Sequence, residues 1–191
     1  MMPIFDHFDF LAPYYDRVIS VPDTDTLEGL LNIPVEGTLL DAGGGTGRIA
    51  QTLTDKVSDV VLVDLSLGML LQAAAKGRIT KVCSFSEKLP FEDESFDRII
   101  MIDALHHVNN QEETAGELWR VLKPGGILVI EEPDVTKFVV KLVALAEKLA
   151  LMRSHFLNPE RIAAMYSNDS ANIQIYRENS NAWIVVEKEL D

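Results

Sequence analysis

The chain has 191 residues, 47% hydrophobic and 25% charged, so it is long enough to bury a substantial core and is not expected to be disordered. Its formal net charge of −13 repels nucleic-acid phosphates, and we expect no nucleic-acid partner. A single cysteine excludes an internal disulfide, and without a signal peptide or a bilayer-length apolar run we expect a cytoplasmic protein with no membrane insertion.

Short apolar runs alternate with helical patterns along most of the chain. Strands are predicted at residues 38–42, 57–63, 79–85, 96–102 and 127–131, and helices at 46–54, 66–76 and 111–122. Strands that alternate with helices and are nearly continuous in Val, Ile and Leu predict a parallel sheet covered on both faces. The tail differs, because residues 173–176 and 182–187 flank a polar turn and predict an antiparallel hairpin.

The most informative segment is residues 39–48, with the sequence LLDAGGGTGR. A predicted strand runs into Asp41, and a glycine then occupies every second position from Gly43 to Gly47. Such glycines let the backbone turn tightly and approach a ligand closely, which predicts a nucleotide-like cofactor. The dinucleotide motif G-x-G-x-x-G would require a third glycine where Arg48 stands, so a nicotinamide-dependent oxidoreductase is disfavoured.

An acidic residue ends the second predicted strand. Asp64 follows Gly47 by 17 residues, a spacing that in a βαβ unit brings its carboxylate to the neighbouring strand's carboxyl end. There it can accept hydrogen bonds from both hydroxyl groups of a ribose. The alternative is a solvated loop aspartate.

Four segments together carry a family resemblance. They are the D-x-G-x-G-x-G pattern at 41–47, LPFEDESFD at 89–97, RVLKPGG at 120–126, and the opening APYYD at 12–16. Taken in chain order, they resemble class I S-adenosylmethionine (SAM) dependent methyltransferases, in particular the small-molecule enzymes of ubiquinone and menaquinone biosynthesis. The resemblance implies a Rossmann-like α/β fold: a seven-stranded, mostly parallel sheet with helices on both faces and a C-terminal antiparallel hairpin. It also implies a single domain over residues 1–191, with an N-terminal helical lid at about 1–35.

The same resemblance implies SAM as the cofactor and suggests which residues bind it. Asp41, Gly43 and Gly45 would face its methionine end, Asp64 its ribose, and Leu65 would pack on its adenine. The other implied cofactor-binding residues are Ser86 and Glu87 at the adenine edge, Asp103 after the fourth strand, and Tyr15 in the lid. Tyr15 has the alternative of anchoring a helix in the core.

One position departs from the family pattern. An acid after the third strand usually accepts the adenine amino group, whereas this chain has Phe85 there. Either Ser84, Ser86 or backbone carbonyls hold the adenine edge, or Phe85 contributes packing alone.

The methyl acceptor is expected at the carboxyl ends of the strands, where open α/β sheets bind ligands. His106 and His107 follow the fourth strand and are the candidates for proton transfer, with capping of the loop as the alternative. No metal-ligand spacing appears, so no metal is expected. Apolar residues surround a lysine stripe in the predicted helix 136–153, which indicates a core helix, with an apolar acceptor pocket or a homodimer contact as alternatives.

The sequence therefore predicts a SAM-dependent methyltransferase that acts on a small, apolar organic acceptor. The alternative from another class is a SAM-binding sensor or regulatory subunit without turnover.

Overall fold

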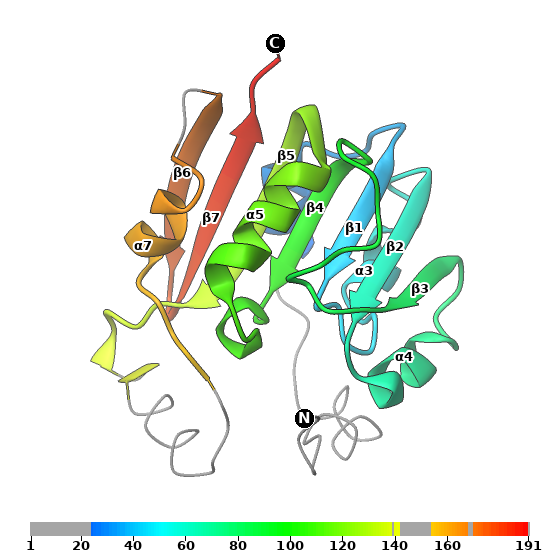
Figure 1. Ribbon diagram of the computed structural model, residues 1–191, viewed down its shortest axis with the longest axis horizontal. Helices are drawn as coiled ribbons and strands as arrows, with labels where there is room; N and C mark the ends of the chain where they lie inside the picture. Colours follow the sequence, from blue (N-terminus) through cyan, green and yellow to red (C-terminus); the bar gives the residue numbers. More distant parts are fainter. Residues whose placement is uncertain (1–23, 139, 142–153, 168–169, 191) are drawn as a thin grey trace.

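The strands of the protein form one sheet whose strand order brings β1 and β4 to the centre. The structure is a computed structural model that describes residues 24–138, 140–141, 154–167 and 170–190. Within these residues, seven strands run in the order β3-β2-β1-β4-β5-β7-β6 (Figure 1). They are β1 (Thr38–Ala42), β2 (Asp59–Asp64), β3 (Ile79–Cys83), β4 (Phe96–Ile102), β5 (Leu122–Pro133), β6 (Ala171–Glu178) and β7 (Asn181–Lys188). The first five are parallel and β7 is antiparallel to both neighbours, which confirms the predicted fold class.

Helices cover both faces of this sheet. On one face, α2 (Thr24–Leu31), α3 (Ala50–Leu53) and α4 (Leu67–Ala73) share a core with the inward side chains of the strands. On the other, α5 (Gln111–Val121), α7 (Pro159–Ala164) and the 3-10 helix η1 (Leu105–His107) form a second core; α5 and α7 lie in front of the sheet in Figure 1. The carboxyl ends of the parallel strands lie between these two layers.

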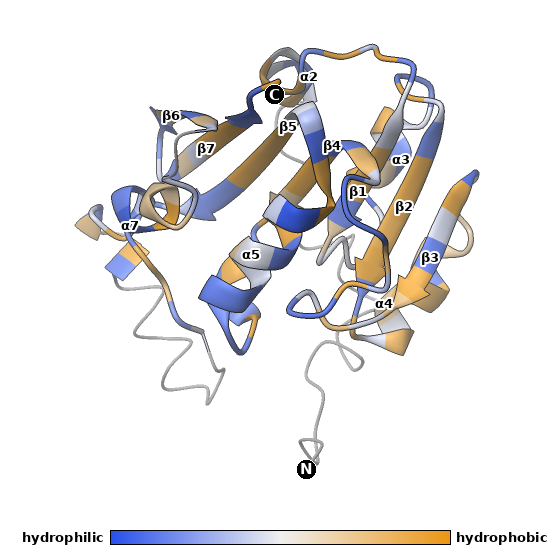
Figure 2. Ribbon diagram, turned by 45° about the horizontal axis from the view of Figure 1, so that its top comes forward, coloured by the Kyte–Doolittle hydropathy of each residue, from blue (hydrophilic) through white to orange (hydrophobic). Residues whose placement is uncertain are grey.

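The central strands are apolar because both of their faces are buried. In β4, Ile99 and Met101 belong to the core beneath α5, whereas Ile100 and Ile102 belong to the core beneath α2 and α3. Side chains alternate along a strand, so a segment buried on two sides, such as residues 99–102, is apolar at successive positions. Figure 2 shows this as hydrophobic colouring over most of β2 and β4.

Two predicted elements have different limits in the structure. The helix predicted at 46–54 is shorter, because the glycine loop continues through Gly47, whose N–H donates to the carbonyl of Gly44 at 2.9 Å, and α3 begins only at Ala50. The strand predicted at 127–131 is longer, because β5 already begins at Leu122 and ends at Pro133. Phe96 pairs with Leu122 and Arg98 with Ile127, so the extra residues of β5 form a bulge at this point.

The described part of the expected N-terminal lid belongs to the core. Leu27 and Leu31 of α2 are fully buried, and the Arg98 guanidinium donates to the carbonyl of Leu31 at 2.6 Å. Tyr15, with residues 1–23, and most of the helix predicted at 136–153 lie outside the described residues. Among the helices that are described, none is both long and apolar enough to cross a membrane.

Candidate functional site

The carboxyl ends of β1, β2 and β4 bring three acidic residues to one edge of the sheet. Asp41 is the next-to-last residue of β1, Asp64 is the last residue of β2, and Asp103 follows β4 with φ +53°. The glycine loop after β1 turns across the end of β2, because the N–H groups of Gly43 and Gly44 donate to the carbonyl of Val63 at 2.8 and 3.2 Å. The loop and both neighbouring carboxylates thus form one unit.

Asp64 holds the glycine loop and the following helix together. Its Oδ2 accepts from the N–H of Gly45 at 2.8 Å, and its Oδ1 accepts from the N–H of Ser66 at 2.8 Å. Ser66 in turn caps α4 by accepting from the N–H of Met69 at 3.1 Å. A carboxylate has about four acceptor positions, and these backbone contacts use two of them.

Asp41 is a buried carboxylate with an unsatisfied oxygen. The residue is 2% exposed, and no hydrogen bond to its Oδ2 occurs within the described part of the chain. Burial raises the pKa of Asp41 to about 7, with a further rise from Asp64, while Arg48 acts in the opposite direction. A buried acceptor without a donor is costly in a folded protein, so this atom is a candidate ligand contact.

Gly44 packs directly against this carboxylate, and sequence reasoning missed it. A Cβ at Gly44 would lie 2.6 Å from Cγ of Asp41 and 2.8 Å from Cγ of Leu62. By contrast, a Cβ at Gly45 would meet no atom closer than 3.9 Å. The alternating glycine pattern directed attention to every second position; the run of three consecutive glycines was the available signal.

A second buried carboxylate lies near the same edge. Burial and the neighbouring Asp103 raise the pKa of Glu131 to about 7, although Asn181 donates a side-chain hydrogen bond to it and Arg48 lowers it. Asp41 and Glu131 therefore both resist ionisation, first because they are buried and second because other acidic groups lie nearby. A ligand that carries positive charge would relieve both, and this fits SAM, which has an ammonium and a sulfonium group.

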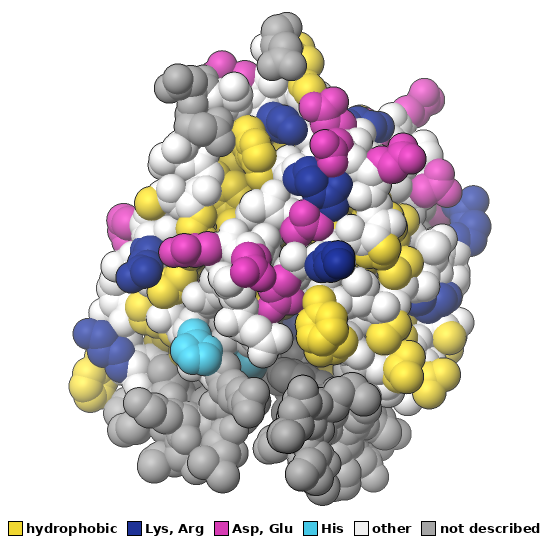
Figure 3. Space-filling model, viewed as in Figure 1, with side chains coloured by type: hydrophobic (Ala, Val, Ile, Leu, Met, Phe, Trp, Pro, Cys, Tyr) yellow, Lys and Arg dark blue, Asp and Glu magenta, His cyan; other side chains and the backbone are white. Residues whose placement is uncertain are grey.

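Apolar side chains are exposed where the cofactor's base is expected. Leu65 after β2 is 50% exposed and Phe85 after β3 is 49% exposed. The ends of these two strands are in contact, since the Cys83 thiol lies 3.5 Å from the carbonyl of Leu65. Hydrophobic side chains gather near α4 and the end of β3 on the surface in Figure 3, where Leu67 and Leu71 are also exposed. Such a surface suits an aromatic ring.

The loop after β3 is held by contacts that sequence analysis did not predict. Ser86 is 8% exposed, and Glu87 Oε1 accepts from the N–H groups of Asn109 and Asn110 at 2.7 and 3.2 Å. Asn110 also caps α5 through its side chain. Ser84 donates to the carbonyl of Lys88 at 3.1 Å. At least one oxygen of Glu87 is thus engaged in joining this loop to the start of α5, and its contact with adenine stays a prediction.

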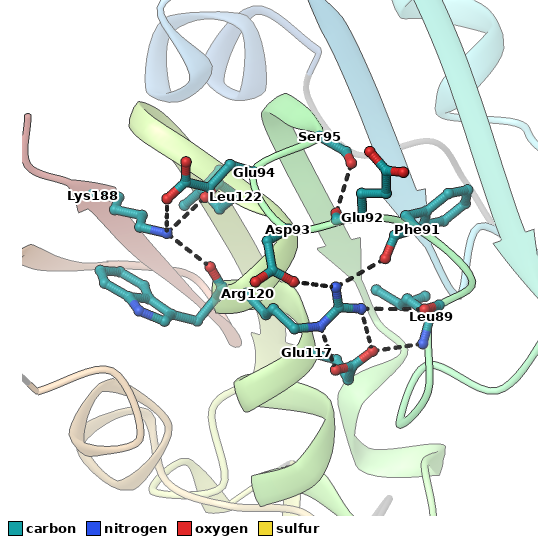
Figure 4. Close-up of polar contacts among 11 residues, drawn as sticks. Leu89, Phe91, Glu92, Asp93, Glu94, Ser95, Glu117, Arg120, Leu122 and Lys188 are labelled. Atoms are coloured by element: carbon teal, nitrogen blue, oxygen red, sulfur yellow. Dashed lines mark hydrogen bonds and ion pairs between the residues drawn. The ribbon is translucent and has the colours of Figure 1, made fainter.

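The far end of the same loop is fixed by an ion pair on α5 (Figure 4). Arg120 donates from Nε to Glu117 at 2.7 Å, and from its terminal nitrogens to the carbonyls of Phe91 and Leu89 at 2.8 and 3.2 Å. Glu117 also accepts from the N–H of Leu89 at 2.8 Å. Asp93 completes the set with an ion pair to Arg120 at 2.8 Å. The planar guanidinium therefore fixes the loop on the helix.

The two histidines differ in burial. His106 is 2% exposed, whereas His107 is partly buried, with Nδ1 3.4 Å from the Ser154 hydroxyl. Burial, together with the adjacent His106, lowers the pKa of His107 to about 3, so its imidazole is neutral at physiological pH. The described residues contain no group of three side chains suited to a metal ion.

Sequence comparison identifies relatives with named activities. Residues 40–130 match the methyltransferase domain family. The chain is 35% identical over 133 residues to a demethylmenaquinone methyltransferase of Renibacterium salmoninarum, covering 65% of this chain and 56% of that protein. It is 34% identical over 146 residues to the Mycobacterium tuberculosis enzyme of the same name, covering 76% of this chain and 59% of that one. The chain thus spans a little over half the length of these relatives.

Solved structures share the fold. A SAM-dependent methyltransferase from Thermotoga maritima superposes with a TM-score of 0.76 at 22% identity, covering 95% of this chain and 98% of that one. A second, from Mesorhizobium loti, has a TM-score of 0.76 at 18% identity and covers 88% and 99% of the two chains. The matched domain, the relatives and the shared fold support a class I SAM-dependent methyltransferase and indicate SAM as its cofactor. This confirms the family and the cofactor expected from the sequence.

Proposed function

We propose that the protein transfers the methyl group of SAM to a small apolar acceptor of the hydroquinone type. The observation that carries this proposal is the pair of buried carboxyl groups, Asp41 and Glu131, whose pKa values are both raised to about 7 at the glycine loop. They match a cationic cofactor, and the relatives named for quinone methylation supply the acceptor class. When bound, SAM supplies an activated methyl group on a positively charged sulfur.

Each residue of the site has a role in this proposal. Asp41 accepts from the cofactor's ammonium group through its unsatisfied Oδ2, and Asp64 accepts from the ribose hydroxyls. Gly43 and Gly45 let the backbone approach the methionine end. The rest of the proposed cofactor site comprises Leu65 and Phe85 against the adenine, Ser86 and Glu87 at its edge, Asp103 beside Glu131, and Tyr15.

His107 is proposed to face the acceptor. A neutral imidazole accepts a hydrogen bond from an acceptor hydroxyl and orients the ring toward the methyl group. With a pKa near 3 it is a weak base, and efficient proton transfer needs a pKa closer to the working pH. Positioning of the acceptor is therefore its expected contribution, since methyl transfer in line depends strongly on orientation.

The test uses purified protein, SAM and a chemically reduced demethylmenaquinone with a short prenyl chain. We expect S-adenosylhomocysteine to form in step with the methylated quinone, both measured by mass spectrometry. A parallel series offers a catechol and a primary amine of similar size. Tight binding of S-adenosylhomocysteine without product from any acceptor would identify a SAM-binding protein without turnover. Preference for the amine would refute the hydroquinone class.

A further inference from the structure

One buried carboxylate holds three consecutive residues of the loop that carries the histidines. Glu132, on β5, is 3% exposed. Its Oε1 accepts from the N–H groups of Ala104 and Leu105 at 3.1 and 2.8 Å, and its Oε2 lies 2.7 Å from Nδ1 of His106. Glu131 beside it faces the opposite side of the strand and contacts Asn181 instead. Glu132 was not among the site residues expected from the sequence.

These contacts decide where η1 begins. Ala104 is the N-cap of η1 and provides no side-chain cap, so the first N–H groups of this turn need an acceptor from elsewhere. Glu132 supplies it from the neighbouring strand. Hydrogen bonds to an ionised acceptor are stronger than neutral ones, and burial increases that difference.

The same turn touches the glycine loop. A Cβ at Gly43 would lie 2.7 Å from Cβ of Ala104, so the two backbones are in close contact. The N–H of His107 donates to the carbonyl of Ala104 at 3.0 Å. A shift of Ala104 therefore changes the position of His107 relative to the proposed cofactor site.

The ring of His106 connects Glu132 with His107. It stacks on Phe156 with centroids 4.3 Å apart and an interplanar angle of 16°, and its centroid lies 3.9 Å from that of His107. The carboxylate accepts from Nδ1–H and fixes both the tautomer and the orientation of this ring. His106 acts as a spacer whose own placement is set by Glu132.

We propose that Glu132 is a positioning residue that sets His107 in place toward the acceptor, beside the proposed cofactor site, through Ala104 and His106. The inference rests on the function proposed above. It requires no contact between Glu132 and either substrate, because its three contacts are all to the chain itself.

Glu132→Gln is the discriminating substitution. The amide oxygen is expected to keep both backbone N–H groups, which leaves the NH₂ group facing His106. Nδ1 of His106 must then lose its proton to become an acceptor, so the tautomer reverses while the backbone contacts remain. Asp97→Asn is the matched control. Asp97 accepts from Lys123 and from the N–H of Thr38, but at the opposite end of β4.

Two readouts test the proposal without an acceptor. Titration calorimetry measures the Kd of S-adenosylhomocysteine, and NMR of ¹⁵N-histidine-labelled protein follows the ring nitrogens of His106 and His107. We expect the Kd of Glu132→Gln to stay within about twofold of the native value and the Nδ1 proton of His106 to be lost. The His107 response, which is the change in its ring-nitrogen chemical shifts when S-adenosylhomocysteine binds, should fall by at least half. With the best acceptor, kcat should drop by about tenfold or more, whereas Asp97→Asn should change neither readout.

Several results would overturn the inference. An unchanged His107 response, or an unchanged kcat despite the reversed tautomer, would refute positioning. A Kd that weakens in proportion to kcat would assign Glu132 to support of the cofactor site instead. If the native protein methylates nothing, the proposed function fails, and the NMR response alone decides the inference. If Glu132→Gln does not fold, Glu132→Asp replaces it, because a carboxylate one methylene shorter cannot reach all three partners. The His107 response and kcat should then fall as they do for Glu132→Gln.

Discussion

Replacing Asp41 by asparagine should stabilise the protein while it weakens cofactor binding. The pKa of the native carboxyl group is raised from 3.8 to about 7. At pH 8 the group is ionised in both states, and its charge costs more free energy in the folded protein than in the unfolded chain. With 1.36 kcal/mol per pKa unit, this penalty is about 4 kcal/mol. The stability present at low pH is therefore lost as pH rises from about 4 to 7.

Asparagine removes the charge but keeps a buried polar group. That group has its own desolvation cost of about 1–3 kcal/mol, so the net gain at pH 8 should be about 1–3 kcal/mol. For a chain of this size the corresponding increase in Tm is roughly 2–10 °C. At pH 4 or below, where native Asp41 is protonated, the variant should have no such advantage.

Cofactor affinity should change in the opposite direction. Loss of a charge-assisted hydrogen bond to the ammonium group of SAM costs about 1.5–3 kcal/mol, or roughly 10- to 150-fold in Kd. Native affinity should rise with pH through 7 as Asp41 ionises, and this dependence should be weaker in Asp41→Asn. Urea denaturation at pH 8 and pH 4, with calorimetric titration of SAM from pH 6 to 8, gives both quantities. An Asp41→Asn protein no more stable than the native one at pH 8 would refute the assignment of a strained carboxylate.

Three further substitutions test other parts of the site. Asp64→Ala removes the acceptor for Gly45, Ser66 and the proposed ribose, and should weaken S-adenosylhomocysteine binding at least about 100-fold, whereas Asp59→Ala, at the exposed start of the same strand, should leave the calorimetric Kd unchanged. Gly44→Ala places a Cβ 2.6 Å from Cγ of Asp41 and should abolish binding. Gly77→Ala, outside the proposed site and with no atom within 4 Å of the added Cβ, should cost only about 1–2 kcal/mol of stability for its φ of +87°; equal losses in thermal melts and titrations would contradict this contrast. Arg120→Lys keeps the charge but not the planar set of donors to Leu89, Phe91 and Glu117, and should reduce the free energy of unfolding by about 1–2 kcal/mol; a urea midpoint equal to the native value would show that these contacts contribute little.

The sequence alone determined the order of strands and helices along the chain and predicted a cofactor site at the glycine run. Continuous apolar runs such as residues 99–102 indicate burial on both faces, and the glycine run beside Asp41 indicates close backbone approach. The position of the acid at the end of β2 is predicted from its spacing to the glycines. The lengths of the helix and strand in one βαβ unit determine which residue reaches the carboxyl end of the second strand. These features are local, so they can be read along the chain.

Contacts between residues distant in sequence were decided only by the tertiary structure. Glu132 lies 26 residues from His106, and Leu89 lies 28 residues from Glu117; nothing in either local pattern shows which partner each will meet. The unsatisfied oxygen of Asp41 and the raised pKa of Glu131 likewise depend on how several strand ends converge. Sequence patterns specify which face of an element is buried, but hydrogen-bond partners and local dielectric arise only when separate elements pack against each other.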